Sequence, residues 1–252
     1  MKVVYRVALM AAAVVLLAFS VPVQASDMDD RIESSARASY VFKTYLEGDD
    51  IELQSKDGAV TLTGVVAEES RRGLAKNTVE SIPGVTSVDN RLVVKGASPT
   101  PNSDAWLVEK VKTTLLFNRN VSASTTKVDV KDGIVTLRGE AASQAQKELT
   151  AEYARDVDGV KDVKNEILVS KTSETSMERL VQKIDDASIV AQVKMTLLFH
   201  RSTSALSTKV DSSDGAVTMY GKASNAAEKD LVTKLVNDIN GVKSVKNRMT
   251  IE

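Results

Sequence analysis

The chain contains 252 residues, of which 42% are hydrophobic, and its 33 lysine and arginine residues nearly balance 34 aspartate and glutamate residues. This much apolar material can build one packed core or several small ones, whereas a net charge of −1 argues against a general nucleic-acid-binding protein. Cysteine is absent and histidine occurs once, at His200, which excludes disulfides, thiol catalysis and sites with several Cys or His ligands. We therefore expect no enzyme, no cofactor, no metal and no nucleic-acid partner.

The N-terminus has the pattern of a secretory signal peptide. Lys2 and Arg6 precede an uncharged apolar run at 7–19, and Val23-Gln24-Ala25 has the small-residue form of a cleavage site. The run is shorter than the roughly 20 residues that span a bilayer, although a retained anchor is the alternative. We predict a signal peptide at 1–25, cleaved after Ala25, and a periplasmic mature protein without a lipid-modified cysteine.

Three copies of one sequence unit follow, at 29–95, 104–170 and 186–252. Glycine recurs at three matching positions in each copy, namely Gly58, Gly64 and Gly84, then Gly133, Gly139 and Gly159, then Gly215, Gly221 and Gly241. Each copy also contains an equivalent phenylalanine and closes on a valine and an asparagine. We expect the glycines to serve turns and helix caps rather than a ligand loop.

The second copy shows the order of elements most clearly. An apolar stripe of helical period runs from 104 to about 117, and residues 127–131 and 134–138 alternate on either side of Asp132-Gly133, which predicts a hairpin. Gly139 is expected to end the second strand. A second helix from about Ser143 is expected to end at a left-handed cap, Asp158-Gly159, before a third strand at 163–169. This order predicts an α+β fold of three tandem αββαβ modules, each a small three-stranded sheet with two helices on one face.

The two joints between the modules differ in composition. Residues 96–103 form a Pro/Ser-rich linker that cannot continue a helix, so modules 1 and 2 are expected to be independently mobile. Residues 171–185 are predicted to be a partly helical linker, because Met177, Leu180 and Val181 recur at helical spacing.

These features resemble the BON domain family. The resemblance rests on Val-Lys-x-x-Leu in the first helix, on the hairpin motif Asp-Gly-x-Val-x-Leu/Met-x-Gly and on the ending Gly-Val-x-x-Val-x-Asn. Members with a signal peptide are similar to hyperosmotically inducible periplasmic proteins, usually with two modules. The resemblance implies binding of phospholipid at the cell envelope and support of other envelope proteins during osmotic stress.

One face of the first helix of module 2 suggests where lipid would bind. A rotation of 100° per residue places Trp106, Lys110 and Phe117 together, away from the core stripe of Leu107 to Leu115. Aromatic and basic side chains suit an anionic membrane surface, and the copies become more basic from the first to the third. The predicted lipid-binding residues are Trp106, Lys110, Lys112, Phe117, Arg119, Lys194, Phe199 and Arg201. The alternative is that Trp106 packs against a neighbouring module or its own linker.

Two functions of different classes remain at this point. The first is a non-enzymatic protein that binds anionic phospholipid at a membrane surface. The alternative is a periplasmic chaperone or adaptor that binds envelope proteins through a sheet face or strand edge. His200 is expected to be a solvated side chain at a helix end, where a cation suits the helix dipole.

Overall fold

The computed structural model describes residues 23–96, 99–170, 183–203 and 208–251, which form three αββαβ modules. The predicted fold class is therefore confirmed. Most of the predicted signal peptide and the predicted helical turn within 171–182 lie outside the described residues. Both stay predictions.

Module 2 shows the repeated unit in its most continuous form. Its elements are α3 (Asp104–Phe117), η2 (Ala123–Thr125), β5 (Thr126–Lys131), β6 (Ile134–Ala141), α4 (Gln144–Arg155) and β7 (Asp162–Val169). The strand order is β5-β6-β7, with β6 antiparallel to β5 and parallel to β7. Both helices cover one face of the sheet, because Val128, Val135 and Leu137 all turn their side chains to that side and are buried there.

Modules 1 and 3 repeat this topology with their third strand in two pieces, and in module 3 the second strand is also divided, so that β10 pairs with β12 in a separate small sheet. Module 1 contains α1 (Val23–Ala38), η1 (Val41–Tyr45), β1 (Asp50–Lys56), β2 (Ala59–Val66), α2 (Glu69–Glu80), β3 (Ser87–Asn90) and β4 (Val93–Val94). Module 3 contains α5 (Asp186–Phe199), β8 (Lys209–Ser213), β9 (Ala216–Tyr220), β10 (Lys222–Ala223), α6 (Ala226–Asn237), β11 (Ser244–Asn247) and β12 (Thr250–Ile251).

An aspartate at the start of each module ties its first helix to its hairpin. In module 2 the carboxylate of Asp104 accepts the N–H groups of Asp132 and Gly133, both at 2.8 Å. Asp29 and Asp186 accept the equivalent pairs in their own modules. Because both turn residues have positive φ, the turn leaves two N–H groups without partners in the ladder, and the aspartate satisfies them.

The asparagine near the end of each module connects its last strand to its second helix. Asn165 donates from Nδ2 to the Lys147 carbonyl at 2.8 Å and accepts the Ile167 N–H at Oδ1. Asn90 and Asn247 make the same pair of contacts. The repeated Val-x-Asn ending is therefore explained by a structural hydrogen bond between strand and helix.

Two predicted boundaries in module 2 are wrong. Gly139 does not end its strand, since β6 runs on to Ala141 with Gly139 paired inside the ladder. A Cβ at Gly139 would lie 1.9 Å from the Thr125 carbonyl oxygen, so the residue is glycine because another backbone approaches it. Gly159 does not cap α4 either: the helix ends at Arg155, and Gly159, with φ of 95°, lies in the following turn.

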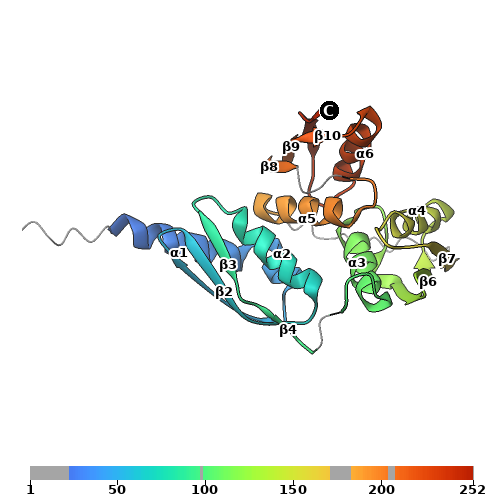
Figure 1. The fold of residues 1–252 in the computed structure, drawn as a ribbon, viewed down its shortest axis with the longest axis horizontal. Coiled ribbons are helices and arrows are strands. Elements are labelled where there is room, and N and C mark those ends of the chain that lie inside the picture. Colours follow the sequence, from blue (N-terminus) through green and yellow to red (C-terminus); the bar gives the residue numbers. More distant parts are fainter. Residues whose placement is uncertain (1–22, 97–98, 171–182, 204–207, 252) are drawn as a thin grey trace, which may run out of the picture.

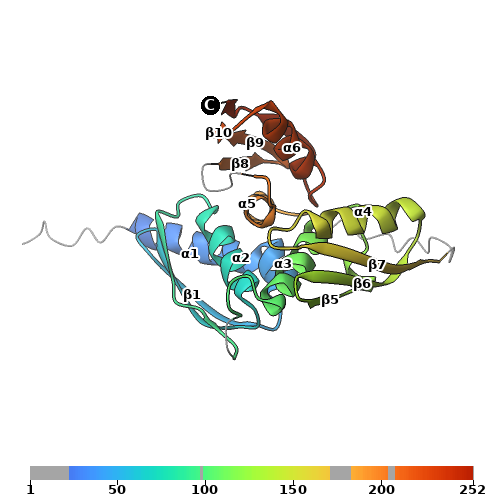
Figure 2. The same cartoon turned by 45° about the vertical axis from the view of Figure 1, so that its right-hand side comes forward.

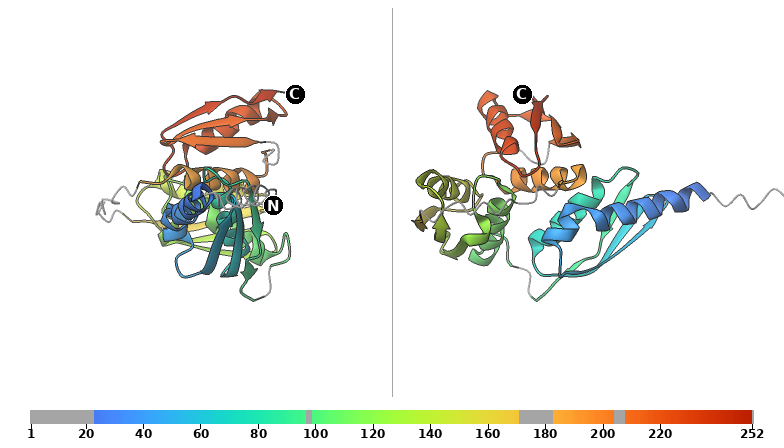
Figure 3. Two further views of the ribbon diagram at one scale, coloured as in Figure 1. Left: turned by 90° about the vertical axis from the view of Figure 1, so that its left-hand side faces the viewer. Right: turned by 180° about the vertical axis from the view of Figure 1, so that it is seen from behind.

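The three modules pack around α5. Figures 1 and 2 show α5 between module 1 and module 2, with the sheet of module 3 covering it from above, and the rear view in Figure 3 shows α1 lying along the sheet of its own module. Helix α2 of module 1 and helix α3 of module 2 both contact α5. Ten residues of α5 are buried in consequence, including Ser188 and Gln192.

The expected independence of modules 1 and 2 is contradicted. Phe117 of module 2 belongs to the same buried cluster as the core of module 1, and its ring centroid lies 5.4 Å from that of Tyr45. Module 1 is also tied to module 3, because the Tyr40 N–H donates to Asp185 at 2.7 Å and the Val41 N–H donates to Ser188 at 3.0 Å. The regular α-helix ends before these two residues. A Pro/Ser linker removes local stiffness, but apolar contacts beyond it still hold the modules together.

Candidate functional site

The predicted membrane-facing side of α3 lies against other modules. Phe117 is 1% exposed, Lys110 is 2% exposed, and Phe199 at the equivalent position of module 3 is 7% exposed. The helical-face argument is correct in separating these residues from the stripe of Leu107, but the expectation that the face meets solvent is wrong. Among the alternatives, the contact of Trp106 with its surroundings favours packing inside the protein.

The buried Lys110 forms a cation–π pair with the half-buried Trp106. The Lys110 ammonium lies 4.0 Å from the indole centroid and 5.6 Å from the ring centroid of Phe199. It donates to the Asp158 carbonyl at 2.8 Å and lies 3.4 Å from the Asp158 carboxylate. Burial lowers the pKa of Lys110, and Asp158 offsets part of this effect. The pair therefore fastens α3 to the turn after α4 and leaves no ammonium for a lipid headgroup.

Modules 2 and 3 exchange equivalent backbone contacts along a surface that we call the seam. Asp158 of module 2 donates its N–H to the Phe199 carbonyl at 2.7 Å, and Asn240 of module 3 donates to the Phe117 carbonyl at 2.9 Å. Isolated β-bridges join 118 to 239 and 157 to 200 in the same reciprocal manner. The two modules are thus related by a local two-fold axis, as in an isologous dimer built inside one chain.

Arg119 and Arg201 belong to the seam rather than to a lipid site. The Arg119 guanidinium donates to the carbonyls of Ile239 and Val242, both at 2.6 Å. The Arg201 guanidinium donates to the carbonyls of Arg155, Val157 and Val160 in module 2. Each arginine therefore donates to several carbonyls at and just after the end of the second helix of the other module, which is the fork-like donation that Arg makes well.

Module 1 lacks the residues that this seam requires. Thr44 occupies the repeat position of Arg119 and Arg201, so the guanidinium is missing. Pro83 occupies the position of Asp158 and Asn240, and proline has no N–H to donate to a phenylalanine carbonyl. Comparing the three copies in the sequence shows both differences. Only the structure shows that they remove hydrogen-bond donors of the seam.

Helices α3 and α5 each have a lysine and a leucine that reach solvent. Lys112 is exposed on α3, and Leu116, one turn later, is 40% exposed. At the same repeat positions of α5, Lys194 is half-buried and Leu198 is 49% exposed. Of the predicted lipid-binding residues, Lys112 and Lys194 are therefore the two whose ammonium groups remain accessible.

A groove of about 300 Å³ lies beside Lys112 at the boundary of modules 1 and 2. Module 1 contributes Tyr45 and Leu74 to it, and module 2 contributes Leu115 and Leu116. Its rim carries charges of both signs, because Arg71 and Glu68 also line it. Nearby Glu109 has its pKa raised by burial and by the Glu68 carboxylate. The rim is therefore not a purely cationic surface.

His200 is not the solvated residue that the sequence predicts. Its side chain is 7% exposed, because the end of α5 lies inside the seam. Burial lowers the pKa of the imidazole. The Asp156 carboxylate raises that pKa, and the Arg201 guanidinium lowers it. Within the described ranges, no cluster of three or more His, Asp or Glu side chains could hold a metal ion. No helix in the same ranges is long and apolar enough to cross a bilayer.

Comparison with known proteins matches the three modules separately. The BON domain model matches residues 28–96, 103–171 and 185–252. The chain is 32% identical over 143 residues to osmotically-inducible protein Y of Escherichia coli, covering 55% of this chain and 71% of that protein. It is 34% identical to a 21 kDa hemolysin of Actinobacillus pleuropneumoniae, covering 45% of this chain and 59% of the other. It is 32% identical to outer membrane lipoprotein DolP of Haemophilus influenzae, covering 43% and 57%. The chain belongs to the BON domain family, as a protein with three copies of the domain.

Proposed function

We propose that this protein works at the bacterial cell envelope, outside the cytoplasm, where it binds membrane surfaces that contain anionic phospholipid. Support for the location comes from the relatives, whose names describe an osmotically inducible protein and an outer membrane lipoprotein. The predicted cleavage after Ala25 agrees with it. The proposal includes a role in osmotic stress, which the name of the first of these relatives supports.

The observation that carries the proposal is the pair of lysine and leucine that is repeated on helices α3 and α5. Lys112 with Leu116, and Lys194 with Leu198, each place an ammonium one helical turn before an exposed apolar side chain. A leucine can enter the headgroup region while the lysine binds phosphate beside it. The proposed lipid contact does not include Phe117 and Phe199, which are buried, or Trp106, which is half-buried and stacks on Lys110.

Vesicle co-sedimentation at low salt tests the proposal. The protein should pellet with vesicles of phosphatidylglycerol and phosphatidylcholine, and should stay in the supernatant with phosphatidylcholine alone. Each basic residue near an anionic surface contributes about 1 kcal/mol, so Lys112→Gln with Lys194→Gln should weaken binding roughly 30-fold. The matched control is Lys131→Gln with Lys164→Gln, which removes the same charge from exposed positions of the module 2 sheet. Equal binding to neutral vesicles, or equal losses in both double variants, would refute the proposal.

A second function has one specific observation in its favour. Strand β7 is an edge strand of its sheet, and at its end Leu168 is 69% exposed and Val169 is 41% exposed. Exposed apolar residues on a strand edge can bind an extended segment of an unfolded envelope protein by adding a strand. This chaperone function predicts that the protein suppresses aggregation of a denatured outer-membrane protein without lipid, and that Leu168→Lys removes the effect. Suppression that Leu168→Lys leaves unchanged would exclude this edge.

A further inference from the structure

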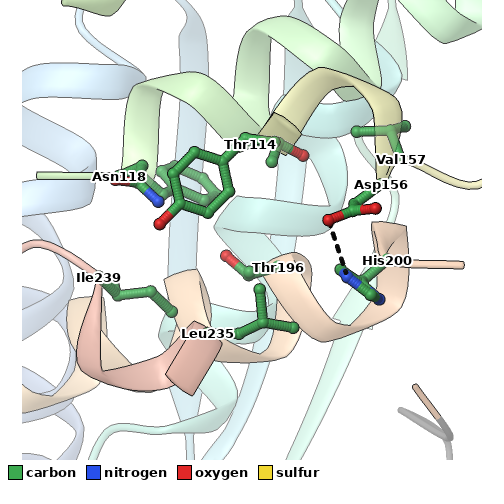
Figure 4. Close-up of a pocket in the computed structure, with 10 residues that line it drawn as sticks. Thr114, Asn118, Asp156, Val157, Thr196, His200, Leu235 and Ile239 are labelled. Atoms are coloured by element: carbon green, nitrogen blue, oxygen red, sulfur yellow. Dashed lines mark ion pairs between the residues drawn. The ribbon is translucent and has the colours of Figure 1, made fainter. Parts of the chain in front are cut away.

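A small cavity of about 10 Å³ lies on the seam, where the ends of α3, α4, α5 and α6 meet. Figure 4 shows Thr114 of module 2 and Thr196 of module 3 in its walls, with Asn118 and His200 near the ends of their helices. Thr114 and Thr196 occupy the same repeat position, and so do Asn118 and His200. The cavity therefore lies close to the local two-fold axis that relates the modules.

Three polar atoms in these walls have no hydrogen-bond partner among the described residues. They are Thr114 Oγ1, Thr196 Oγ1 and His200 Nε2, and all are buried. A volume of about 10 Å³ is at the lower limit for holding a buried water, which needs two to four polar partners. The seam therefore encloses polar groups of both modules, including the His200 imidazole, that the protein itself does not satisfy.

The hydrogen bonds of His200 favour its neutral form. The Ser202 N–H donates to His200 Nδ1 at 3.1 Å, so Nδ1 acts as an acceptor and Nε2 carries the proton. An imidazolium would carry a proton on both nitrogens, so protonation would replace this bond by a repulsive contact between two N–H groups. It would also place a charge on a side chain that is 7% exposed.

The charged groups around His200 do not compensate for this cost. Among the residues that the structure describes, Asp156 at the end of α4 supplies the carboxylate that acts on the imidazole, with Oδ2 3.9 Å from Nε2, and it is 48% exposed. Arg201 follows His200 directly, and its positive charge opposes protonation. Tyr153 of α4 also lines the cavity, and its hydroxyl donates to Asp238 of module 3 at 2.7 Å. Burial and this bond raise the pKa of Tyr153, which keeps the phenol neutral.

We propose that the seam between modules 2 and 3 is a pH-sensitive junction, in which protonation of His200 loosens the contacts at one end. That end holds the 157–200 bridge, the Arg201 N–H bond to the Asp156 carbonyl at 3.0 Å and the Asp158 N–H bond to Phe199. The opposite end has Asn118 in place of His200, and an asparagine amide has no proton to gain in this range. Loosening is therefore confined to one half of an otherwise symmetric seam.

The direction of the pH effect follows from linkage. Because the pKa of His200 is lower in the folded protein than in the unfolded chain, the unfolded chain binds more protons as the pH falls below about 6.5. The stability contributed by neutral His200 is therefore present above that pH. It is lost as the pH falls through the unfolded pKa toward the folded one.

Two measurements on the intact protein test the proposal. Since His200 is the only histidine, its ring signals in NMR report one titration, and the midpoint should lie below 6.5. Hydrogen exchange at pH 7.5 and 5.5 should show protection factors at 153–160 and 196–203 falling by up to about tenfold, which is the limit for one histidine with an unfolded pKa of 6.5, with little change at 114–120 and 235–242. His200→Asn, which copies Asn118, should abolish this difference between the two ends.

Three results would overturn the proposal. The first is an NMR midpoint at or above that of an exposed histidine. The second is an equal loss of protection at both ends of the seam, which would indicate general acid destabilisation. The third is an unchanged pH response in His200→Asn. The NMR titration needs no variant, so the proposal remains testable even if that substitution fails to fold.

Discussion

Asn240→Pro tests whether the seam depends on the backbone hydrogen bond between Asn240 and Phe117. Asn240 donates its N–H to the Phe117 carbonyl at 2.9 Å, and proline cannot donate. Module 1 has the sequence Ile82-Pro83-Gly84 where module 3 has Ile239-Asn240-Gly241, so the turn itself accepts proline. The substitution leaves a buried carbonyl without a partner, which costs about 1–3 kcal/mol of unfolding free energy.

The assay is urea unfolding at pH 7.5, followed by hydrogen exchange of residues 112–120. Asn240→Asp is the matched control, because it copies Asp158 and retains the N–H group. We expect it to change the unfolding free energy by no more than about 0.5 kcal/mol. Asn240→Pro should also expose the end of α3 to exchange while the hairpin of module 2 stays protected. If both variants have the same stability and the same protection at 112–120, the seam does not depend on this bond.

Two further predictions concern the contact between modules and the repeated aspartate. Phe117→Ala should lower the unfolding free energy by about 3–5 kcal/mol, because the ring is 1% exposed and packs on Tyr45. Phe42→Ala, at the equivalent position of module 1, should cost less, because Phe42 is half-buried. Equal losses of unfolding free energy in urea would contradict a core shared by modules 1 and 2. Burial alone would raise the pKa of Asp186, but the hydrogen bonds from Ser212, Gly215 and Asp214 outweigh it and hold the pKa below its usual value. The stability that ionised Asp186 contributes is therefore present above pH 3.8 and is lost as the pH falls through the folded pKa. When the unfolding free energy is measured against pH, Asp186→Asn should reduce its fall in acid. The control Asp230→Asn, at an exposed position, should leave that fall unchanged.

The first helix of module 2 shows how far a sequence pattern can predict a site. Helical periodicity correctly places Lys110 and Phe117 on a face separate from the core of their own module. Periodicity carries no information about what covers that face, and an aromatic and basic surface is typical of both a membrane contact and a buried cation–π pair. The same limit applies to His200, which follows a helix in the sequence but lies between two modules in space.

Local structure and the repeat are determined by the sequence alone. Alternating and helical hydrophobic patterns, together with the Asp-Gly turns, specify strands, helices and hairpins within a few residues, because these elements depend on neighbours in the chain. The pairing of modules 2 and 3 and the position of α5 among the three modules come from the tertiary structure. They depend on carbonyl groups, arginine side chains and apolar faces that are separated in the sequence by more than a hundred residues. A local sequence pattern therefore does not show which of three similar modules will be the partner.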